Sequence, residues 1–191
     1  MIFEGVITTT NEDGSAHVTP MGFIRETGAV TVAPFVPSTT LDNLRRHHAA
    51  VMSLTDDVRI IAGCLTGRRD WPVIRAAHVD GWRLGDCLAH LEMEVVEQTD
   101  DPQRPEFRCQ VVAEETHRAF SGFNRAQAAV IEASILVSRL DWLTPEKVAV
   151  EMAYLTLAVE KTAGERERLA WKWLVDAIAC HPKHRNKPET L

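Results

Sequence analysis

The chain has 191 residues, of which 45% are hydrophobic and 25% are charged, and these are the proportions of a globular protein rather than of a disordered one. It carries 21 Lys and Arg against 27 Asp and Glu, a formal net charge of −6 at pH 7. This balance argues against non-specific binding to nucleic acid or to an anionic membrane, because both need a basic face.

The four cysteines lie far apart in the sequence and include no C-x-x-C pair: Cys64, Cys87, Cys109 and Cys180. We therefore expect reduced thiols that pack in the interior, and no metal site. The first residues, MIFEGVITTTNEDG, contain no basic region followed by a long apolar run, so we expect no signal peptide. No apolar run of about 18 residues follows, so we expect no membrane span and a cytoplasmic protein.

The first third of the chain is rich in β-branched and aromatic residues, which favour strands. Five strands are predicted there, over residues 2–10, 15–25, 28–35, 49–55 and 58–67. The sequence NEDG joins the first two as a turn in which Gly14 takes a positive φ. Pro20 and Gly22 do not suit a regular central strand, so we expect a bulge or a sheet edge at these positions.

Residues 38–48 are predicted to form a short helix between the third and fourth strands. From 68 to 88 the pattern is weak, and it indicates no more than a loop with a short helical turn. Residues 88–99 and 106–118 then alternate apolar and polar side chains on either side of DDPQRP. This is the pattern of a long antiparallel hairpin with a charged outer face.

The last third changes to a helical period, with six apolar residues on one face: Ala129, Val130, Ala133, Leu136, Val137 and Leu140. Thr144 is predicted to cap a second helix that begins at Pro145, and Gly164 separates it from a third. We expect the helices to enclose three tryptophans: Trp142, Trp171 and Trp173.

Strands followed by helices indicate an α+β fold, in which the strands close into a small antiparallel β-barrel and a C-terminal helical appendage follows. We predict a barrel domain over residues 1–120 and a helical subdomain over residues 121–180. The polar, proline-containing sequence HPKHRNKPETL is predicted to form a flexible tail over residues 181–191.

The stretch PSTTLDNLRRHH is the first candidate for a binding site, because three hydroxyl residues precede its helix: Ser38, Thr39 and Thr40. One of them must serve as the N-cap. Together with Asn43, the remaining groups surround the exposed N–H groups at the positive end of the helix dipole, which is how helices bind phosphate. A capped connector helix and a phosphate site both fit the sequence, and Arg45 and Arg46 fit either as solvated side chains.

The second candidate is TPMG, residues 19–22. A proline and a glycine within a strand let the backbone leave the ladder, which exposes N–H and C=O groups to a flat ligand. A bulge that bends a barrel strand would explain the same residues.

A third pattern is the recurrence of Arg125, Glu132 and Arg139 every seven residues along the first C-terminal helix. Surface ion pairing explains this spacing, and a buried row against the barrel or a second subunit is the alternative. The sequence contains no G-x-S-x-G, P-loop, Rossmann or H-E-x-x-H motif, and the histidines do not have the spacing of a metal site. If the protein is an enzyme, we expect a cofactor to supply the chemistry.

Three blocks of the sequence resemble those of the DUF447 family: GVITTTNEDGSAHVTPMGF, STTLDNLRRHHAAVMSLTDD and FNRAQAAVIEASILVSRL. That family is similar to the flavin reductase-like, FMN-binding split barrels. The resemblance runs from Ile2 to Leu174 and is weakest between Arg68 and Leu88. It implies a six-stranded antiparallel split β-barrel that dimerises, with one FMN in each of two sites at the subunit interface.

The resemblance also implies which residues hold the flavin. In split barrels of this type the phosphate is held by the segment that corresponds here to Ser38, Thr39, Thr40 and Asn43. The ring lies along backbone that corresponds to Thr19, Pro20, Met21 and Gly22. Two further residues match the family's helix motif and are expected near the flavin or its phosphate: Asn124 and Arg125.

The implied function is that of a homodimeric flavoprotein, a flavin reductase-like oxidoreductase that moves hydride between NAD(P)H and the flavin or a small-molecule electron acceptor. A flavin supplies its own redox chemistry, which agrees with the lack of a catalytic motif. The alternative is a non-catalytic flavin-binding or interaction protein that holds FMN without turnover. A third interpretation makes the barrel a scaffold whose helices serve a partner.

Overall fold

The computed structural model describes residues 1–184, and the chain divides into two compact units. The first unit comprises Met1–Asp56 and Asp70–Phe120, and the second comprises Asp57–Arg69 together with the chain from Ser121 onward. The segment Asp57–Arg69 therefore leaves the first unit and contributes to the second. No helix in the described range is long and apolar enough to cross a membrane. Residues 185–191 of the predicted tail lie outside the described residues.

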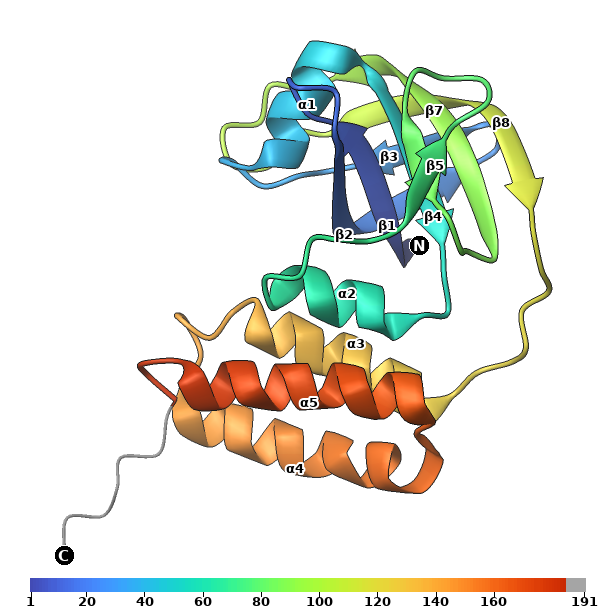
Figure 1. Ribbon diagram of the computed structural model, residues 1–191. Helices are drawn as coiled ribbons and strands as arrows, with labels where there is room; N and C mark the ends of the chain where they lie inside the picture. Colours follow the sequence, from blue (N-terminus) through green and yellow to red (C-terminus); the bar gives the residue numbers. More distant parts are fainter. Residues whose placement is uncertain (185–191) are drawn as a thin grey trace, which may run out of the picture. The chain divides into compact units, whose positions relative to one another are not determined.

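The first unit is a closed, antiparallel six-stranded barrel, drawn in blue to yellow in Figure 1. Its strands are β1 (Ile2–Thr10), β2 (Ala16–Glu26), β3 (Ala29–Val32), β4 (Ala49–Leu54), β7 (Ala89–Gln98) and β8 (Phe107–Thr116). They are hydrogen-bonded in the order β1-β2-β3-β8-β7-β4, and β4 pairs with β1 to close the barrel. The prediction of an antiparallel barrel is confirmed, although β3 is shorter than the predicted 28–35.

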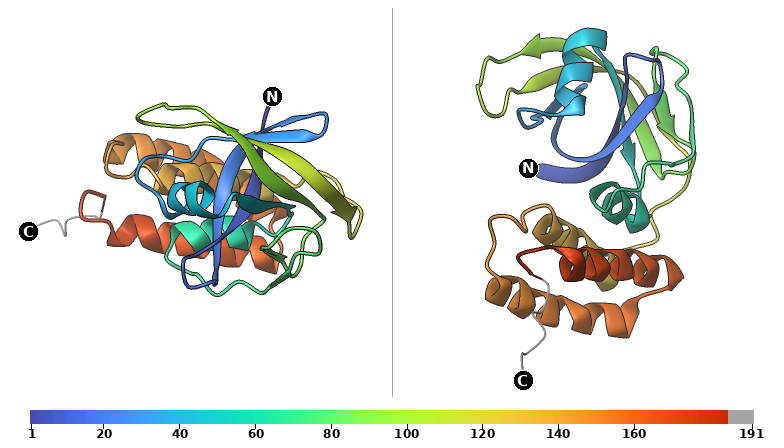
Figure 2. Two further views of the ribbon diagram at one scale, coloured as in Figure 1. Left: turned by 90° about the horizontal axis from the view of Figure 1, so that it is seen from above. Right: turned by 60° about the vertical axis from the view of Figure 1, so that its left-hand side comes forward.

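The barrel interior is filled by alternate side chains of its strands, among them Ile7, Met52, Leu91 and Phe107. Helix α1 (Thr39–His47) lies over one end of the barrel, as Figure 2 shows. Its apolar side chains, Leu41 and Leu44, belong to the same buried cluster. The predicted helix is thus confirmed, and its apolar face is fixed against the barrel core.

The segment 68–88, where the sequence indicates a loop with a short helical turn, instead contains a two-stranded sheet of β5 (Val73–Arg75) and β6 (Trp82–Leu84). We call residues 70–88 the flap. It covers side chains on the outer face of β7, since Leu91 and Met93 point into the barrel and His90 and Glu92 alternate with them. His90 is 2% exposed and Glu92 is 1% exposed.

The flap is held to β7 by the carboxylate of Glu92. This group accepts backbone N–H bonds from Ala77 at 2.9 Å, from His78 at 2.5 Å and from Val79 at 2.9 Å. Burial raises the pKa of Glu92, but these three N–H donors and His90 outweigh it and lower the pKa to about 2. Glu92 is therefore a buried, ionised anchor for the flap.

The strand predicted over residues 58–67 is wrong, because these residues form helix α2 (Val58–Leu65) in the second unit. Asp57 caps it by accepting the N–H of Arg59 at 3.1 Å. Val58 and Ala62 lie one helical turn apart and pack in one buried cluster with the C-terminal helices. A short apolar run fits a buried strand and a buried helix equally well. Here the run becomes a helix because it packs against the C-terminal helices.

The C-terminal helices are α3 (Arg125–Val137), α4 (Pro145–Thr162) and α5 (Glu165–Cys180), which lie side by side in the second unit (Figures 1 and 2). Thr144 caps α4 as predicted, accepting the N–H of Lys147 at 3.3 Å. Trp171 and Trp173 pack among the helices, whereas Trp142 is 79% exposed and its predicted packing is wrong. The cysteines are free thiols; three are buried as expected, but Cys180 is exposed.

Candidate functional site

The barrel wall is interrupted between β2 and β3. The ladder between them joins Phe23–Glu26 to Ala29–Val32, so within the described chain β2 has no strand partner on this side at residues 19–22. On the other side the same residues pair with β1 without a shift in register. Residues 19–22 therefore form the predicted sheet edge, and the alternative of a bulge is wrong.

A cavity of about 210 Å³ opens at this edge. Its lining comes from β2, from the segment between β3 and α1, from the first turn of α1 and from the loop between β7 and β8. The lining residues are Thr19, Pro20, Met21, Gly22, Ala33, Pro34, Phe35, Ser38, Thr40 and Arg104. A second cavity of about 160 Å³ shares Gly22, Ala33 and Arg104 with it. The structure thus brings the whole TPMG segment together with two of the three hydroxyl residues.

The start of α1 presents hydrogen-bond donors at this cavity. Ser38 is the N-cap, and its hydroxyl accepts the N–H of Leu41 at 3.3 Å. The N–H groups of Thr39 and Thr40 have no acceptor within the helix, because they belong to its first turn. Thr40 is 3% exposed and lines the cavity, whereas Thr39 is exposed. This end of the helix is therefore suited to an anion.

Asn43 is buried behind this helix end and does not line the cavity. Its amide nitrogen donates to Thr9 Oγ1 and to Asn11 Oδ1, both at 3.0 Å, and its oxygen accepts from Arg46 at 3.2 Å. Arg46 also donates to the carbonyl of Thr10, but it is exposed, as is Arg45, which agrees with the prediction that both side chains are solvated. These bonds tie α1 to the end of β1 and fix where the helix begins.

Arg104 is a cavity residue that the sequence did not predict. Its Nε donates to the carbonyl of Ala33 at 2.9 Å, and its guanidinium lies 4.7 Å from the ring centroid of Phe35. Both contacts follow from the pairing of Val32 with Phe107, which brings the β7–β8 loop beside the residues after β3. The sequence predicts the DDPQRP turn, but it does not predict that this turn lies beside the residues that follow β3.

Asn124 and Arg125 belong to the second unit and do not line the cavity. Asn124 is the N-cap of α3, where its oxygen accepts from Ala126 at 2.8 Å and from Gln127 at 3.2 Å. Its nitrogen donates to the carbonyl of Thr162 at 3.1 Å. Arg125 is exposed, as are Glu132 on the same helix and Arg139 in the turn that follows it, which agrees with surface side chains rather than a buried row.

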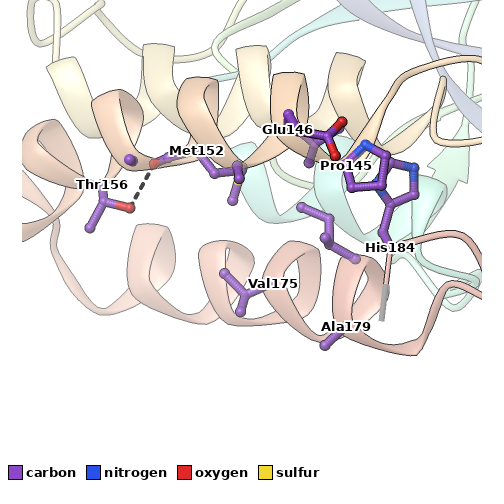
Figure 3. Close-up of a pocket in the computed structure, with 11 residues that line it drawn as sticks. Pro145, Glu146, Met152, Thr156, Val175, Ala179 and His184 are labelled. Atoms are coloured by element: carbon purple, nitrogen blue, oxygen red, sulfur yellow. Dashed lines mark hydrogen bonds between the residues drawn. The ribbon is translucent and has the colours of Figure 1, made fainter. Parts of the chain in front are cut away.

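A larger cavity of about 740 Å³ lies in the second unit between α4 and α5. Its lining is mainly apolar, and Figure 3 shows Glu146 and His184 near each other at one end, with Met152 and Val175 along it. His184 Nε2 lies 2.7 Å from the carbonyl of Leu140, and its Nδ1 has no partner among the described residues.

The sequence matches two family models. The model described as the N-terminal domain of a protein of unknown function, DUF447, covers residues 3–118. The second DUF447 model covers residues 124–176. A search of the curated proteins finds no match. The two matches meet within a few residues of the boundary between the barrel strands and the C-terminal helices.

Solved structures with the same fold include an FMN-bound DUF447 protein from Methanosarcina mazei, with a TM-score of 0.79 and 17% identity over 92% of this chain and 94% of that one. The 2-nitrobenzoate 2-nitroreductase of Pseudomonas fluorescens has a TM-score of 0.52 and 17% identity, over 60% of this chain and 64% of its own. The flavin reductase of styrene monooxygenase from Pseudomonas putida S12 has a TM-score of 0.50 and 18% identity, over 59% and 77%. The barrel therefore has the split-barrel fold that these proteins share.

Proposed function

The chain belongs to the DUF447 family, and from this premise we propose that it binds FMN in the cavity at the β2 edge and acts as a flavin-dependent oxidoreductase. One observation carries the proposal: the cavity joins an unpaired strand edge to the N-terminus of a helix with hydroxyl side chains. A flat ring and a phosphate are the two parts of FMN that such surfaces suit. The solved DUF447 relative, which is FMN-bound, supports the same ligand.

In this proposal the phosphate lies at the start of α1. The N–H groups of Thr39 and Thr40 and the hydroxyls of Ser38, Thr39 and Thr40 would donate to it, while Ser38 keeps its capping bond. Arg104 would add the positive charge that the hydroxyls lack. Asn43 would position the helix rather than contact the phosphate, because its amide is engaged by Thr9 and Asn11.

The ring would lie along residues 19–22. Pro20 has no N–H and Gly22 has no side chain, so this edge is flat and open on the side of the cavities. Main-chain groups here would hydrogen-bond the polar edge of the ring, and Met21 and Phe35 would cover it. Asn124 and Arg125 enter the proposal through the family resemblance alone.

The proposed site is completed by a second copy of the chain. A cavity of about 210 Å³ is smaller than the roughly 300–1,000 Å³ of most ligand sites, so one chain covers only part of the flavin. Large apolar side chains beside it are exposed, namely Ile2 at 68%, Phe3 at 44% and Phe35 at 65%. Such a patch is typical of an interface, and a homodimer would bury it together with the flavin.

When bound, FMN would supply the hydride chemistry of the reaction. Arg104 is the one charged side chain among the lining residues, so the cavity contains no acid–base pair of its own. The chain's residues would bind, orient and shield the cofactor and leave one face to NAD(P)H or an electron acceptor. The same lining also suits a protein that holds FMN without turnover, and steady-state NAD(P)H oxidation with candidate acceptors separates the two.

We expect the purified protein to bind FMN with a Kd of about 1 μM or lower, one flavin per chain. Sedimentation recorded at a flavin absorption wavelength measures binding and mass together, and FMN should sediment with a species of twice the chain's mass. Flavin that sediments with a single chain would contradict the interface but not the binding. Protein that neither retains nor takes up FMN would contradict the proposal itself.

Replacing Thr39 and Thr40 together by alanine should weaken FMN binding about 10- to 100-fold, because the loss of one hydroxyl hydrogen bond to a charged group costs about 1.5–3 kcal/mol and the backbone N–H donors remain. The loss of folding stability should stay near 1 kcal/mol or less, since Ser38 caps the helix. Thr27→Ala, at an exposed turn position, is the matched control. Equal affinity of the double variant and the control would favour the scaffold interpretation.

A further inference from the structure

A cluster of three potential metal ligands lies at the open end of the β7–β8 hairpin, outside the proposed flavin cavity. Cys87 is the second-last residue of the flap, His90 is on β7, and His117 directly follows β8. Their ligand atoms all lie within 4.8 Å of one another. Cys87 and His90 are buried and His117 is the exposed member, so the cluster is reached from solvent through His117.

The hydrogen bonds of His90 orient it as a metal ligand. Its Nε2 lies 3.2 Å from Glu92 Oε1, and a carboxylate accepts, so the proton is on Nε2. In the neutral ring Nδ1 then carries the lone pair, which faces His117 Nε2 at 2.9 Å. A carboxylate that accepts from the distal nitrogen of a histidine is the usual outer partner of a metal-bound imidazole.

Glu92 is itself fixed, because the N–H groups of Ala77, His78 and Val79 hold its carboxylate. His117 also has an acidic neighbour, since its Nδ1 lies 3.7 Å from Glu115 Oε1. Both histidines thus have a carboxylate on the side away from the cluster. The guanidinium of the nearby Arg118 forms ion pairs with the carboxylates of Asp56 at 2.7 Å and Asp86 at 3.5 Å, which offset its positive charge.

We propose that Cys87, His90 and His117 bind a zinc ion, with a water molecule or an additional ligand in the fourth position. One thiolate and two imidazoles are a donor set that Zn²⁺ prefers. Tetrahedral zinc needs donor atoms about 3.3–3.7 Å apart, so the two ring nitrogens, which are 2.9 Å apart, would separate slightly, and a donor pair near the 4.8 Å limit would move closer together. The exposed His117 can make this movement without disturbing the core.

Metal binding changes the protonation of the cluster in a defined way. The proton on His117 Nε2 moves to Nδ1, toward Glu115, so that ring stays neutral. The thiol of Cys87 loses its proton to solvent when the sulfur–zinc bond forms, so one proton is released per ion. The bound ion would then join the end of the flap to both strands of the hairpin.

The test uses the full-length protein, freed of metal with a chelator and titrated with Co²⁺ and Zn²⁺. We expect one Co²⁺ per chain, a thiolate-to-cobalt charge-transfer band, the visible bands of tetrahedral cobalt, and displacement by Zn²⁺. Cys87→Ser should abolish the charge-transfer band and weaken Zn²⁺ binding by at least about 100-fold, whereas Cys180→Ser, at an exposed cysteine, should bind as the parent does. Glu92→Gln should keep the band but weaken Zn²⁺ binding about 10- to 100-fold.

His117→Asn provides a variant at an exposed position, where the fold is not at risk, and it should also lose tight binding. Circular dichroism of each variant checks that it is folded. Absence of the charge-transfer band in the parent protein would overturn the proposal. Equal affinities for Zn²⁺ in the parent, Cys87→Ser and His117→Asn would overturn it as well.

Discussion

Replacing Gly22 by valine is expected to weaken FMN binding by at least about 100-fold, which is about 2.7 kcal/mol, while the barrel stays folded. Gly22 borders both cavities at the β2 edge. A Cβ at this position would meet Ile2 Cγ2 at 3.4 Å and Glu4 Oε1 at 3.7 Å, which are ordinary contacts. Its φ is not positive, so a β-branched residue suits the strand. The added methyl groups would instead occupy the space proposed for the ring.

The matched control is Ala16→Val, which adds similar bulk at the other end of β2, away from the cavities. Both variants should have the circular dichroism spectrum and melting temperature of the parent, and only Gly22→Val should fail to bind FMN. The measurement is a fluorescence titration of FMN with each protein. Unchanged affinity of folded Gly22→Val would exclude residues 19–22 as the surface that contacts the ring.

The elements that the sequence predicts well are those whose signals are local. The hydroxyl before α1, the Thr144–Pro145 start of α4 and the alternating strands β7 and β8 each depend on neighbours a few residues away. The TPMG edge belongs to the same class, because a proline and a glycine limit the ladder at their own positions. These local signals are enough to predict the barrel strands. They also predict the part of the candidate site that comes from the TPMG edge and the start of α1.

The features that the sequence does not reveal depend on which segments meet after folding. Val58–Leu65 has an apolar run that suits a strand, and only its packing against the C-terminal helices makes it α2. Arg104 reaches the cavity because β8 pairs with β3. These two strands are far apart in the sequence, so local patterns do not predict their pairing. Cys87 and His90 have a spacing of three, but the cluster forms only when the hairpin brings His117 beside them.

Residues 70–88 show the same dependence most clearly. Their sequence has little periodicity, because the flap is organised by a carboxylate outside it rather than by its own side chains. Glu92 is one of several acidic residues on an alternating strand and would be read as part of a solvated face. Glu92 is buried only because the flap covers it, and the flap in turn is ordered by its hydrogen bonds to the Glu92 carboxylate.

Glu92→Leu is therefore expected to lower the free energy of unfolding of the barrel by about 3–5 kcal/mol. The change leaves the N–H groups of Ala77, His78 and Val79 without their acceptor, and a buried unsatisfied donor costs about 1–3 kcal/mol. The flap can limit this cost by opening to water, so its amides should exchange faster than the rest of the barrel. Urea denaturation and hydrogen exchange, both with chelator present, measure the two effects.

The matched control is Glu94→Leu, two residues along the same face of β7 but exposed. Its effect on stability should stay within about 0.5 kcal/mol, because no buried donors depend on an exposed carboxylate. Glu92→Gln keeps an oxygen that can accept, and its cost should fall between those of the two leucine variants. If Glu92→Leu and Glu94→Leu cost the same, the flap is held by its apolar contacts, and the carboxylate does not order it.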